Sequence, residues 1–312
     1  MGHGGRSQGG HDTDGSRGDS GSTDARREHP TILAGRAANR TAQQARPILT
    51  GVTATDIAAD LRADKQTRRS FDQVFRSIAD VQGWMTRSQA CRLWDRASEL
   101  RAGDRIVEIG SYHGRSAIVL AGSAPEGVEV ICIDPHGGND RGPQQYEGEF
   151  EEGQRDHETF VNNLTRAGVL DRIRHIRKAS QQAAGDVEGD VEVLYIDGAH
   201  RYNPCKADIE LWGRKVAKGG TLLIHDSFSS VGVTLAEMAT LFFGGRFRYI
   251  GRSNTMTEYR REDLSPLDRV ANGFRQILEF PYLVRNIIFK LLILATLTPV
   301  TRWLGGTGEW PY

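Results

Sequence analysis

The sequence predicts an α/β protein with a doubly wound, mostly parallel sheet of seven strands. From residue 105 onward, short apolar runs rich in β-branched residues alternate with amphipathic stretches, the pattern of buried parallel strands joined by helices. Four of the first five runs end in an acidic residue or in a turn that begins with one: Glu108, Asp134, Asp197 and Asp226. Such sheets bind ligands outside the carboxyl ends of their strands, so we expect a ligand site there.

The N-terminal part of the chain is predicted to contain a disordered tail followed by helices. Residues 1–48 are rich in glycine, serine and mixed charges, and they lack the apolar core of a secretory signal. Residues 49–103 are predicted to form the N-terminal helices. An apolar helix face recurs at spacings of three and four through Phe71, Val74, Phe75 and Ile78. A capping box is indicated by the spacing of Thr86 and Gln89.

The predicted domain of residues 104–262 contains all seven strands. The runs of its parallel part are 105–110, 128–134, 172–176, 191–197 and 220–226. Two further runs, 246–253 and 256–262, follow closely enough to pair as an antiparallel edge. The polar segment 136–157 is too long for a minimal connection. We expect it to be a loop that covers the site or binds substrate, with simple flexibility as the alternative.

Residues 263–312 are predicted to form an apolar helical tail. Its most apolar part, residues 280–304, lacks the roughly 20 uninterrupted apolar residues of a spanning helix. The interruptions are Arg285, Lys290 and Pro299. One alternative is a helix in the membrane interface, with a polar edge made of Arg285, Lys290, Arg302 and Trp303. The other is packing against the domain or in a homo-oligomer.

Charge and cysteine content exclude several classes of protein. Lys+Arg and Asp+Glu both number 40, so no net field attracts nucleic acid, and we expect no nucleic-acid partner. Cys91, Cys132 and Cys205 lie far apart without a C-x-x-C pair. This spacing argues against a disulfide framework or a structural zinc site and favours a cytoplasmic chain.

A glycine-containing loop, VEIGSYHGRSA, follows the first predicted strand. Gly110 permits a sharp turn, and Gly114 is expected to let the backbone approach a ligand. The G-x-x-x-G spacing lacks the middle glycine of the dinucleotide fingerprint, which favours a ligand without pyrophosphate here. Asp134 ends the second run, where a carboxylate accepts hydrogen bonds from ribose hydroxyls. An adenosyl group without phosphates is therefore indicated.

These motifs, together with ICIDPH, KASQQ and YIDGAH followed by GGTLLIHDSF, resemble the class I S-adenosylmethionine-dependent methyltransferases. The likeness is to metal-dependent O-methyltransferases related to macrocin O-methyltransferase and, more distantly, to catechol O-methyltransferase. It covers roughly residues 84–260 and implies a Rossmann-like methyltransferase fold, S-adenosylmethionine as cofactor and a divalent metal, Mg or Mn. The cofactor residues implied are Glu108, Gly110, Ser111 and Gly114 around the methionine portion, Asp134 at the ribose and Ser180 at the adenine. Ser180 also fits a helix N-cap.

The same resemblance implies residues for the chemistry. Methyl transfer to an alcohol needs an aligned and deprotonated oxygen. Asp197, His225 and Asp226 are the implied metal ligands, although His225 stands where the family usually has a carboxylate, and imidazole suits Mn better than Mg. His200 is the implied general base, with a hydrogen bond to the following helix as the alternative.

Two nearby residues have other expectations. Asp208 falls inside a predicted amphipathic helix, where an ion pair or an exposed position is expected rather than catalysis. His136 is either a cofactor contact or a loop residue.

The sequence therefore predicts an S-adenosylmethionine-dependent, metal-assisted O-methyltransferase. Its expected acceptor is a sugar or another polyhydroxylated small molecule, because the segment 136–157 is polar. If the tail of residues 280–304 contacts a membrane, the acceptor becomes a lipid-linked sugar. Two alternatives stay open: an N-methyltransferase without metal, and a membrane-associated protein that keeps the cofactor fold without turnover.

Overall fold

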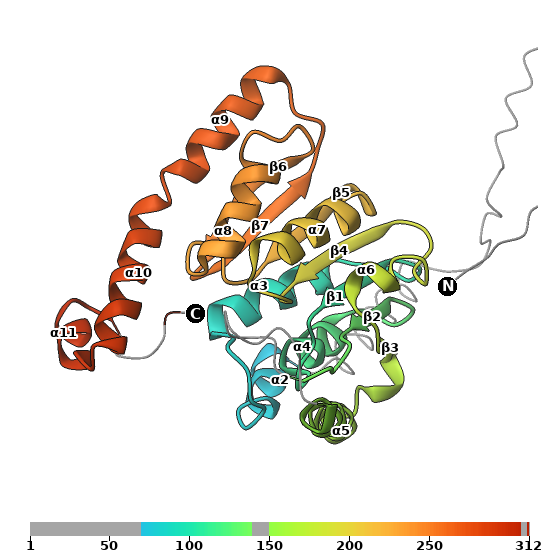
Figure 1. Ribbon diagram of the computed structural model, residues 1–312. Helices are drawn as coiled ribbons and strands as arrows, with labels where there is room; N and C mark the ends of the chain where they lie inside the picture. Colours follow the sequence, from blue (N-terminus) through green and yellow to red (C-terminus); the bar gives the residue numbers. More distant parts are fainter. Residues whose placement is uncertain (1–69, 139–149, 307–310, 312) are drawn as a thin grey trace, which may run out of the picture. The chain divides into compact units, whose positions relative to one another are not determined.

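The computed structural model describes residues 70–138, 150–306 and 311 (Figure 1). The chain divides into two units, Met1–Val52 and Thr53–Tyr312, and all described residues belong to the second. The predicted disorder of residues 1–48 and the predicted helix before residue 70 lie outside the described residues.

A seven-stranded mixed sheet forms the centre of the described fold. Its strands are β1 (Arg105–Ile109), β2 (Glu129–Ile133), β3 (Ile173–Ile176), β4 (Val191–Ile196), β5 (Val216–Ile224), β6 (Phe247–Ser253) and β7 (Met256–Arg261). The strand order is β3-β2-β1-β4-β5-β7-β6. Strands β1 to β5 pair in parallel, whereas β7 is antiparallel to both β5 and β6. The predicted doubly wound sheet with an antiparallel edge is confirmed, and the order reverses between β1 and β4.

Helices cover both faces of this sheet. One face carries α2 (Phe71–Ser77), α3 (Arg87–Ser98), α4 (Arg115–Ser123) and α5 (Phe150–Ala167), and the other carries α6 (Ser180–Ala183), α7 (Tyr202–Trp212) and α8 (Val231–Glu237). Successive strand residues contribute to opposite cores: Ile106 packs with the first group of helices and Val107 with the second. Both faces are therefore dry, which explains why the strands are continuously apolar rather than alternating.

The capping box and the apolar helix face predicted for the N-terminal helices are both present in the structure. The side chain of Thr86 accepts a hydrogen bond from the backbone N–H of Gln89, while the Gln89 side chain accepts one from the Thr86 N–H. Val74 and Ile78, on the predicted apolar face, are buried in the first core. These reciprocal caps and apolar contacts fix α2 and α3 against α4.

Helix α5 shows that part of the predicted loop 136–157 is helical. The helix begins at Phe150, and residues 139–149 lie outside the described residues. The polar composition that indicated a loop includes Glu151 and Glu152, which occupy the first turn of the helix. Acidic side chains there are stabilised by the positive end of the helix dipole, so the loop prediction is wrong from residue 150 onward.

Three helices follow the sheet at the C-terminal end: α9 (Pro266–Ile277), α10 (Phe280–Leu294) and α11 (Thr298–Trp303). Ser265 caps α9 through its side chain, which accepts a hydrogen bond from the Asp268 N–H, and Pro266 begins the helix. In Figure 1 these helices follow one another on the β6–β7 side of the sheet, coloured orange to red. Among the described residues, no helix has both the length and the apolar character needed to cross a membrane.

Candidate functional site

A cavity of about 410 Å³ lies at the carboxyl ends of β1, β2 and β4. Its walls come from the loops that follow these three strands, from the segment 82–85 before α3, and from the start of α6. This is the place where the strand order reverses, as expected for a ligand site in such a sheet. The volume lies within the usual range of small-molecule sites, about 300–1,000 Å³.

Asp134 connects two walls of the cavity. Its Oδ2 atom accepts hydrogen bonds from the backbone N–H groups of Ser111, at 2.9 Å, and Tyr112, at 2.8 Å. Its Oδ1 atom accepts one from the N–H of His136 at 2.7 Å. An ionised carboxylate has about four acceptor positions, so capacity is left for a ligand hydroxyl. Asp134 thus fixes the glycine loop and also lines the cavity.

The two glycines of the loop have different roles. Gly110 has a φ of +87°, and a Cβ atom there would lie 2.2 Å from the carbonyl oxygen of Asp197. Gly114, with a φ of +83°, is the N-cap of α4, and its missing side chain faces Phe160 and Leu164 of α5. The sequence predicted that Gly114 lets the backbone approach a ligand. Instead, side chains of the core fill the space beside Gly114.

Glu108 lies beneath the cavity rather than in its wall. Its carboxylate accepts hydrogen bonds from the Ser116 hydroxyl and, at 3.2 Å, from the Cys132 thiol. Burial raises the pKa of Glu108 to about 7. Ser111 and Ser116 do line the cavity, so the side chain of Glu108 supports the wall from behind.

The other end of the cavity is formed by Ser180, Gln181 and Asp208. The N-cap of α6 is Ala179, so Ser180 is the first residue of the helix rather than its cap. The Ser180 hydroxyl donates to Oδ1 of Asp208, and the Gln181 amide donates to the same atom at 2.8 Å. All three residues line the cavity.

The prediction for Asp208 is wrong. The residue is only 2% exposed, lies in the cavity wall and makes no ion pair within the described ranges. Burial raises the pKa of its carboxyl to about 6. On α7, Asp208 shares the buried face of Cys205, Ile209 and Trp212. The spacing of three and four residues along this face was the signal in the sequence that placed Asp208 inside.

Asp197, His225 and Asp226 gather at the ends of β4 and β5. Each offers a ligand atom, and these atoms all lie within 4.8 Å of one another. His225 Nδ1 is 3.3 Å from Asp197 Oδ1 and 3.5 Å from Asp226 Oδ2. Both ring nitrogens of His225 are buried without a well-aligned hydrogen bond from any described residue. Asp226 has a φ of +58°, so the turn after β5 holds a non-glycine residue in a strained conformation.

His200 joins this group from the loop after β4. Its Nε2 atom lies 2.8 Å from Asp226 Oδ2, and its side chain is 38% exposed. Both His200 and Asp197 line the cavity, so the group opens onto the space that Asp134 and Ser180 also border. The structure therefore brings together the predicted base, the predicted metal ligands and most of the predicted cofactor residues.

The charges in the group determine its protonation. Burial disfavours the charged form of His225, but the charges of Asp197 and Asp226 outweigh burial and raise its pKa well above the ordinary value. In Asp226 burial is likewise outweighed, and the charge of His225 and the hydrogen bond of His200 hold the pKa well below its usual range. For His200, burial lowers the pKa, yet its hydrogen bond to Asp226 and the nearby charges raise it overall.

The cavity also contains Trp84, which belongs to no motif in the sequence, and His136. Trp84, in the segment between α2 and α3, stacks on Tyr112 with ring centroids 5.8 Å apart, and both line the cavity. Its only signal was an aromatic residue beside a glycine between two predicted helices. His136, left undecided by the sequence, is in the cavity wall, with its Nε2 2.8 Å from the carbonyl oxygen of Tyr112.

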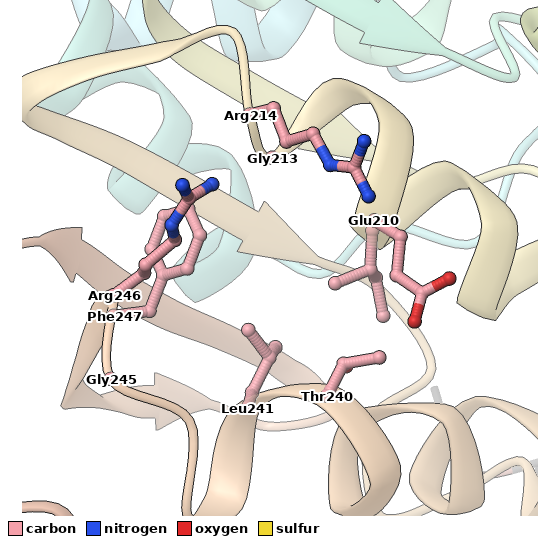
Figure 2. Close-up of a pocket in the computed structure, with 9 residues that line it drawn as sticks. Glu210, Gly213, Arg214, Thr240, Leu241, Gly245, Arg246 and Phe247 are labelled. Carbon is pink, nitrogen blue, oxygen red and sulfur yellow. The ribbon is translucent and has the colours of Figure 1, made fainter.

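A second, smaller pocket of about 170 Å³ lies between the end of α7, the π-helical turn η2 (Met238–Phe242) and the start of β6. Figure 2 shows Arg214 and Arg246 on two sides of it, with Thr240 and Leu241 below. Both arginines are exposed, and the pocket contains none of the residues predicted to act in the site. The larger cavity is therefore the candidate active site.

Comparison with known proteins gives one family. Residues 107–227 match the model of the family described as "Methyltransferase domain". The "Uncharacterized protein y4gI" of Sinorhizobium fredii is 28% identical over 127 residues, which are 39% of this chain and 13% of that protein. This chain thus matches only a small part of that relative.

Solved structures are similar at low identity. SAH-bound methyltransferase PaMTH1 of Podospora anserina is 14% identical, with 68% of this chain and 97% of that chain covered and a TM-score of 0.47. Cofactor-bound Rv0187 from MTB is 19% identical, with 67% and 97% covered and a TM-score of 0.45. SAM-bound O-methyltransferase TomG of Streptomyces achromogenes is 14% identical, with 65% and 96% covered and a TM-score of 0.45.

The family match, residues 107–227, begins inside β1 and ends just after Asp226. It therefore contains all candidate cofactor residues, the three candidate metal ligands and His200. The sheet order places the cavity that several of them line at a topological switch point. The segment 107–227, which contains these residues, is similar to a methyltransferase domain.

Proposed function

We propose that the protein is an O-methyltransferase that uses S-adenosylmethionine and a divalent metal to methylate a hydroxyl of a small polyhydroxylated acceptor, such as a sugar. One observation supports this proposal most directly. Asp197 and His200, at the chemical end, line the same cavity as Asp134 and Ser180, at the proposed nucleoside end. A cofactor and an acceptor bound there would share one enclosed space.

The donor set of the cavity suits an adenosyl cofactor. Asp134 has remaining acceptor capacity for ribose hydroxyls, and the Ser180–Gln181–Asp208 group provides polar atoms for a base. The backbone at Gly110 passes close to that of Asp197 without a Cβ atom, so the methionine end of a bound cofactor would lie near the ends of both β1 and β4. The cofactor supplies a methyl group on a positively charged sulfur, a good leaving group for in-line displacement.

The group Asp197, His225 and Asp226 fits a divalent cation. Two carboxylates face a buried imidazole whose ring nitrogens have no well-aligned hydrogen bond within the described part of the chain. We propose these three residues as ligands. The mixed oxygen and nitrogen donors favour a metal such as Mn²⁺ over strictly oxygen-seeking Mg²⁺. A bound metal would lower the pKa of an acceptor hydroxyl and hold its oxygen in place.

His200 is the proposed general base. Asp226 fixes the orientation of the imidazole through the 2.8 Å contact, and the exposed part of the ring faces the cavity. An imidazole held by a carboxylate is a stronger proton acceptor than a free one, because the carboxylate stabilises the imidazolium. The tyrosine hydroxyl of Tyr195, which donates to Asp197 Oδ2 at 2.9 Å, similarly orients Asp197.

The alternative of an N-methyltransferase without metal is less well supported, because it leaves the buried carboxylate–imidazole group without a purpose. All three cysteines are free, in keeping with the proposed cytoplasmic location. Turnover is part of the proposal, since a binding protein needs no base beside its ligand.

Calorimetric titration of the full chain tests the proposal. We expect S-adenosylmethionine and S-adenosylhomocysteine to bind in EDTA, and methyl transfer to candidate sugars to require Mn²⁺ or Mg²⁺. The variant Asp197→Asn should keep cofactor affinity and lose metal-dependent transfer. The matched variant Glu192→Gln, on the strand that precedes Asp197 but outside the cavity lining, should behave like the wild type.

Two outcomes would contradict the proposal. Absence of cofactor binding under all conditions would remove the methyltransferase activity altogether. Transfer that proceeds equally well in EDTA, or that goes only to amines, would favour the metal-free alternative.

A further inference from the structure

Helix α9 buries its polar side against the domain and exposes its apolar side. Asn272 and Gln276 are buried against the domain: Asn272 accepts a hydrogen bond from the Tyr249 N–H at 2.7 Å and donates to the Phe247 carbonyl at 3.1 Å. The opposite side is apolar and between 49% and 84% exposed, through Leu267, Val270, Phe274 and Leu278. A surface helix normally buries its apolar side.

Helix α10 repeats this arrangement. Asn286 is fully buried and donates to the Phe228 carbonyl at 2.9 Å, and Lys290 donates to the Ser229 carbonyl at 2.8 Å. The side chains on the other side are between 45% and 69% exposed: Val284, Ile288, Leu291 and Leu294. The polar side chains of each helix thus form hydrogen bonds with the domain, and the apolar side chains are exposed.

The exposed apolar side continues along the C-terminal helices, and we call it the outer face of α9–α11. The junction between α9 and α10 keeps helical backbone angles at Leu278, so the spacing of three and four carries across it. Figure 1 shows the two helices running end to end. Trp303, at the end of α11, is 83% exposed. No described residue covers the outer face.

The charge of these helices helps to decide whether a lipid surface or a second copy of the chain covers the outer face. Over residues 266–304 the basic side chains are Arg269, Arg275, Arg285, Lys290 and Arg302, and the acidic ones are Asp268 and Glu279. Both acids are already paired, Asp268 with Arg248 at 3.5 Å and Glu279 with Arg252 at 2.8 Å. These helices therefore carry an excess of basic side chains, five against two, although the chain as a whole has 40 of each sign.

We propose that α9–α11 dock the protein on an anionic lipid surface, with the outer face in the membrane interface. An amphipathic helix with basic residues at its edge and an exposed tryptophan binds such surfaces through both apolar burial and attraction to anionic headgroups. In a symmetric dimer the same patch meets itself, so the positive helices would repel each other. A lipid surface instead supplies the opposite charge.

This docking has a consequence for the candidate site, which rests on the proposed function. Phe228 and Ser229, which α10 holds on its inner side, follow Asp226 in the same turn. The helix that lies on the lipid therefore also supports the turn that carries a proposed metal ligand. An acceptor hydroxyl attached to a lipid, rather than a free sugar, fits this arrangement.

Vesicle flotation of the full chain, without cofactor, tests the docking separately from catalysis. We expect binding to phosphatidylcholine vesicles that contain phosphatidylglycerol, weaker binding to phosphatidylcholine alone, and a decrease at high salt. The triple variant Val284→Ser, Ile288→Ser, Leu291→Ser should bind about tenfold or more weakly, because it removes apolar area from the interface. Arg275→Gln with Arg302→Gln should weaken binding about fivefold for each charge.

A matched control is Val231→Ser, Leu235→Ser, Ile250→Ser, which removes three side chains of similar exposure, between 46% and 56%, from α8 and β6. It should float like the wild type. Thermal unfolding and S-adenosylhomocysteine affinity show whether each variant is folded.

The proposal is overturned if the wild type does not float with anionic vesicles, or if the α10 variant floats as well as the wild type. Sedimentation showing a wild-type dimer that this variant dissociates, without lipid binding, would assign the outer face to a second copy. Loss of methyl transfer with intact flotation would count against the proposed function alone.

Discussion

Asp226 is the residue on which the chemical end of the site depends most. Its carboxylate contacts both His200 and His225, and its backbone is held at a positive φ that a non-glycine residue rarely adopts. Such strain persists only when the surroundings fix it, and here Asn286 and Lys290 bind the carbonyl groups of Phe228 and Ser229, two and three residues after Asp226. The position of one carboxylate therefore depends on a helix some sixty residues further along the chain.

The first prediction at the scale of single residues concerns His200. Replacing His200 by Ala should lower kcat about 10²- to 10⁴-fold, the usual contribution of a general base, because the proton acceptor is lost. Cofactor affinity should change little, since His200 makes no contact with Asp134 or Ser180 at the other end. Steady-state kinetics and calorimetry measure the two effects separately. Full activity of the variant would remove His200 from the mechanism.

A second prediction concerns Asp208. The variant Asp208→Asn keeps the size of the side chain but removes the charge that Ser180 and Gln181 share as acceptor. We expect S-adenosylhomocysteine to bind about tenfold more weakly, because hydrogen bonds to a charged acceptor are stronger than those to a neutral one. Glu210→Gln, an exposed position on the same helix, is the control. Equal affinity of both variants would make Asp208 a structural residue only.

The position of residues that directly follow strands could be predicted from the sequence, whereas their roles stay predictions. Asp134, Asp197 and Asp226 were found because the ends of parallel strands meet at one edge of a sheet. Asp208 was missed because a charged residue of an amphipathic helix was assigned to the exposed side, although its spacing from Cys205 and Trp212 put it on the buried side. Trp84 lies in a connection before the sheet, and only tertiary packing against Tyr112 brings it to the cavity.

At the scale of elements, the close approach of β1 and β4 depends on Gly110. A Cβ atom there would come within 2.2 Å of the Asp197 carbonyl oxygen and must displace one of the two loops. We expect Gly110→Ala to lower the free energy of unfolding by about 1–3 kcal/mol beyond the backbone cost, as for other overpacked sites. Cofactor affinity should fall as well.

Gly103→Ala provides the matched control for this prediction. Gly103 has a similar φ, +93°, but a Cβ atom there would meet nothing within 4 Å. It should therefore show only the cost of a left-handed backbone, about 1–2 kcal/mol. Chemical denaturation of both variants measures the difference, and equal losses would mean that the loops adjust to the added methyl group without strain.

Some helices and strands can be predicted from the periodicity of apolar residues, whereas others depend on tertiary contacts. The strands were predicted because they are buried on both faces and so read as continuous apolar runs. The first turns of α5 read as a loop because Glu151 and Glu152 are polar, whereas the helix is held by Phe160 and Leu164 further on. The burial of the polar side of α9 could not be predicted, because periodicity indicates a helix without showing which side faces the domain.

At the scale of the whole molecule, the two cores enclose carboxyl groups whose pKa is raised by burial. Glu108 lies between β1 and α4, and Glu237 lies between α8 and the β5–β7 side of the sheet. Burial raises the pKa of each to about 7. The stability of the fold should therefore depend on pH well above the range in which ordinary carboxyl groups titrate.

Glu237, which is not one of the proposed ligands, allows this dependence to be tested. Its Oε1 atom accepts hydrogen bonds from Ser227 and Thr257, both at 2.7 Å, and from Tyr259 at 3.3 Å. Because the folded pKa, about 7, exceeds the ordinary 4.5, the folded state holds a proton that the unfolded state releases. The stabilisation is fully present below about pH 4.5, declines as pH rises, and is lost above about pH 7.

The variant Glu237→Gln, which is neutral at every pH, should lack this decline. Between about pH 5 and pH 8 the free energy of unfolding of the wild type should fall relative to the variant by on the order of 3 kcal/mol, the value of such a pKa difference. Glu108 and Asp208 are present in both proteins, so their contributions cancel. Urea denaturation across this range measures the difference. Parallel pH profiles would show that Glu237 is ionised in the folded protein and that its three hydrogen bonds outweigh burial.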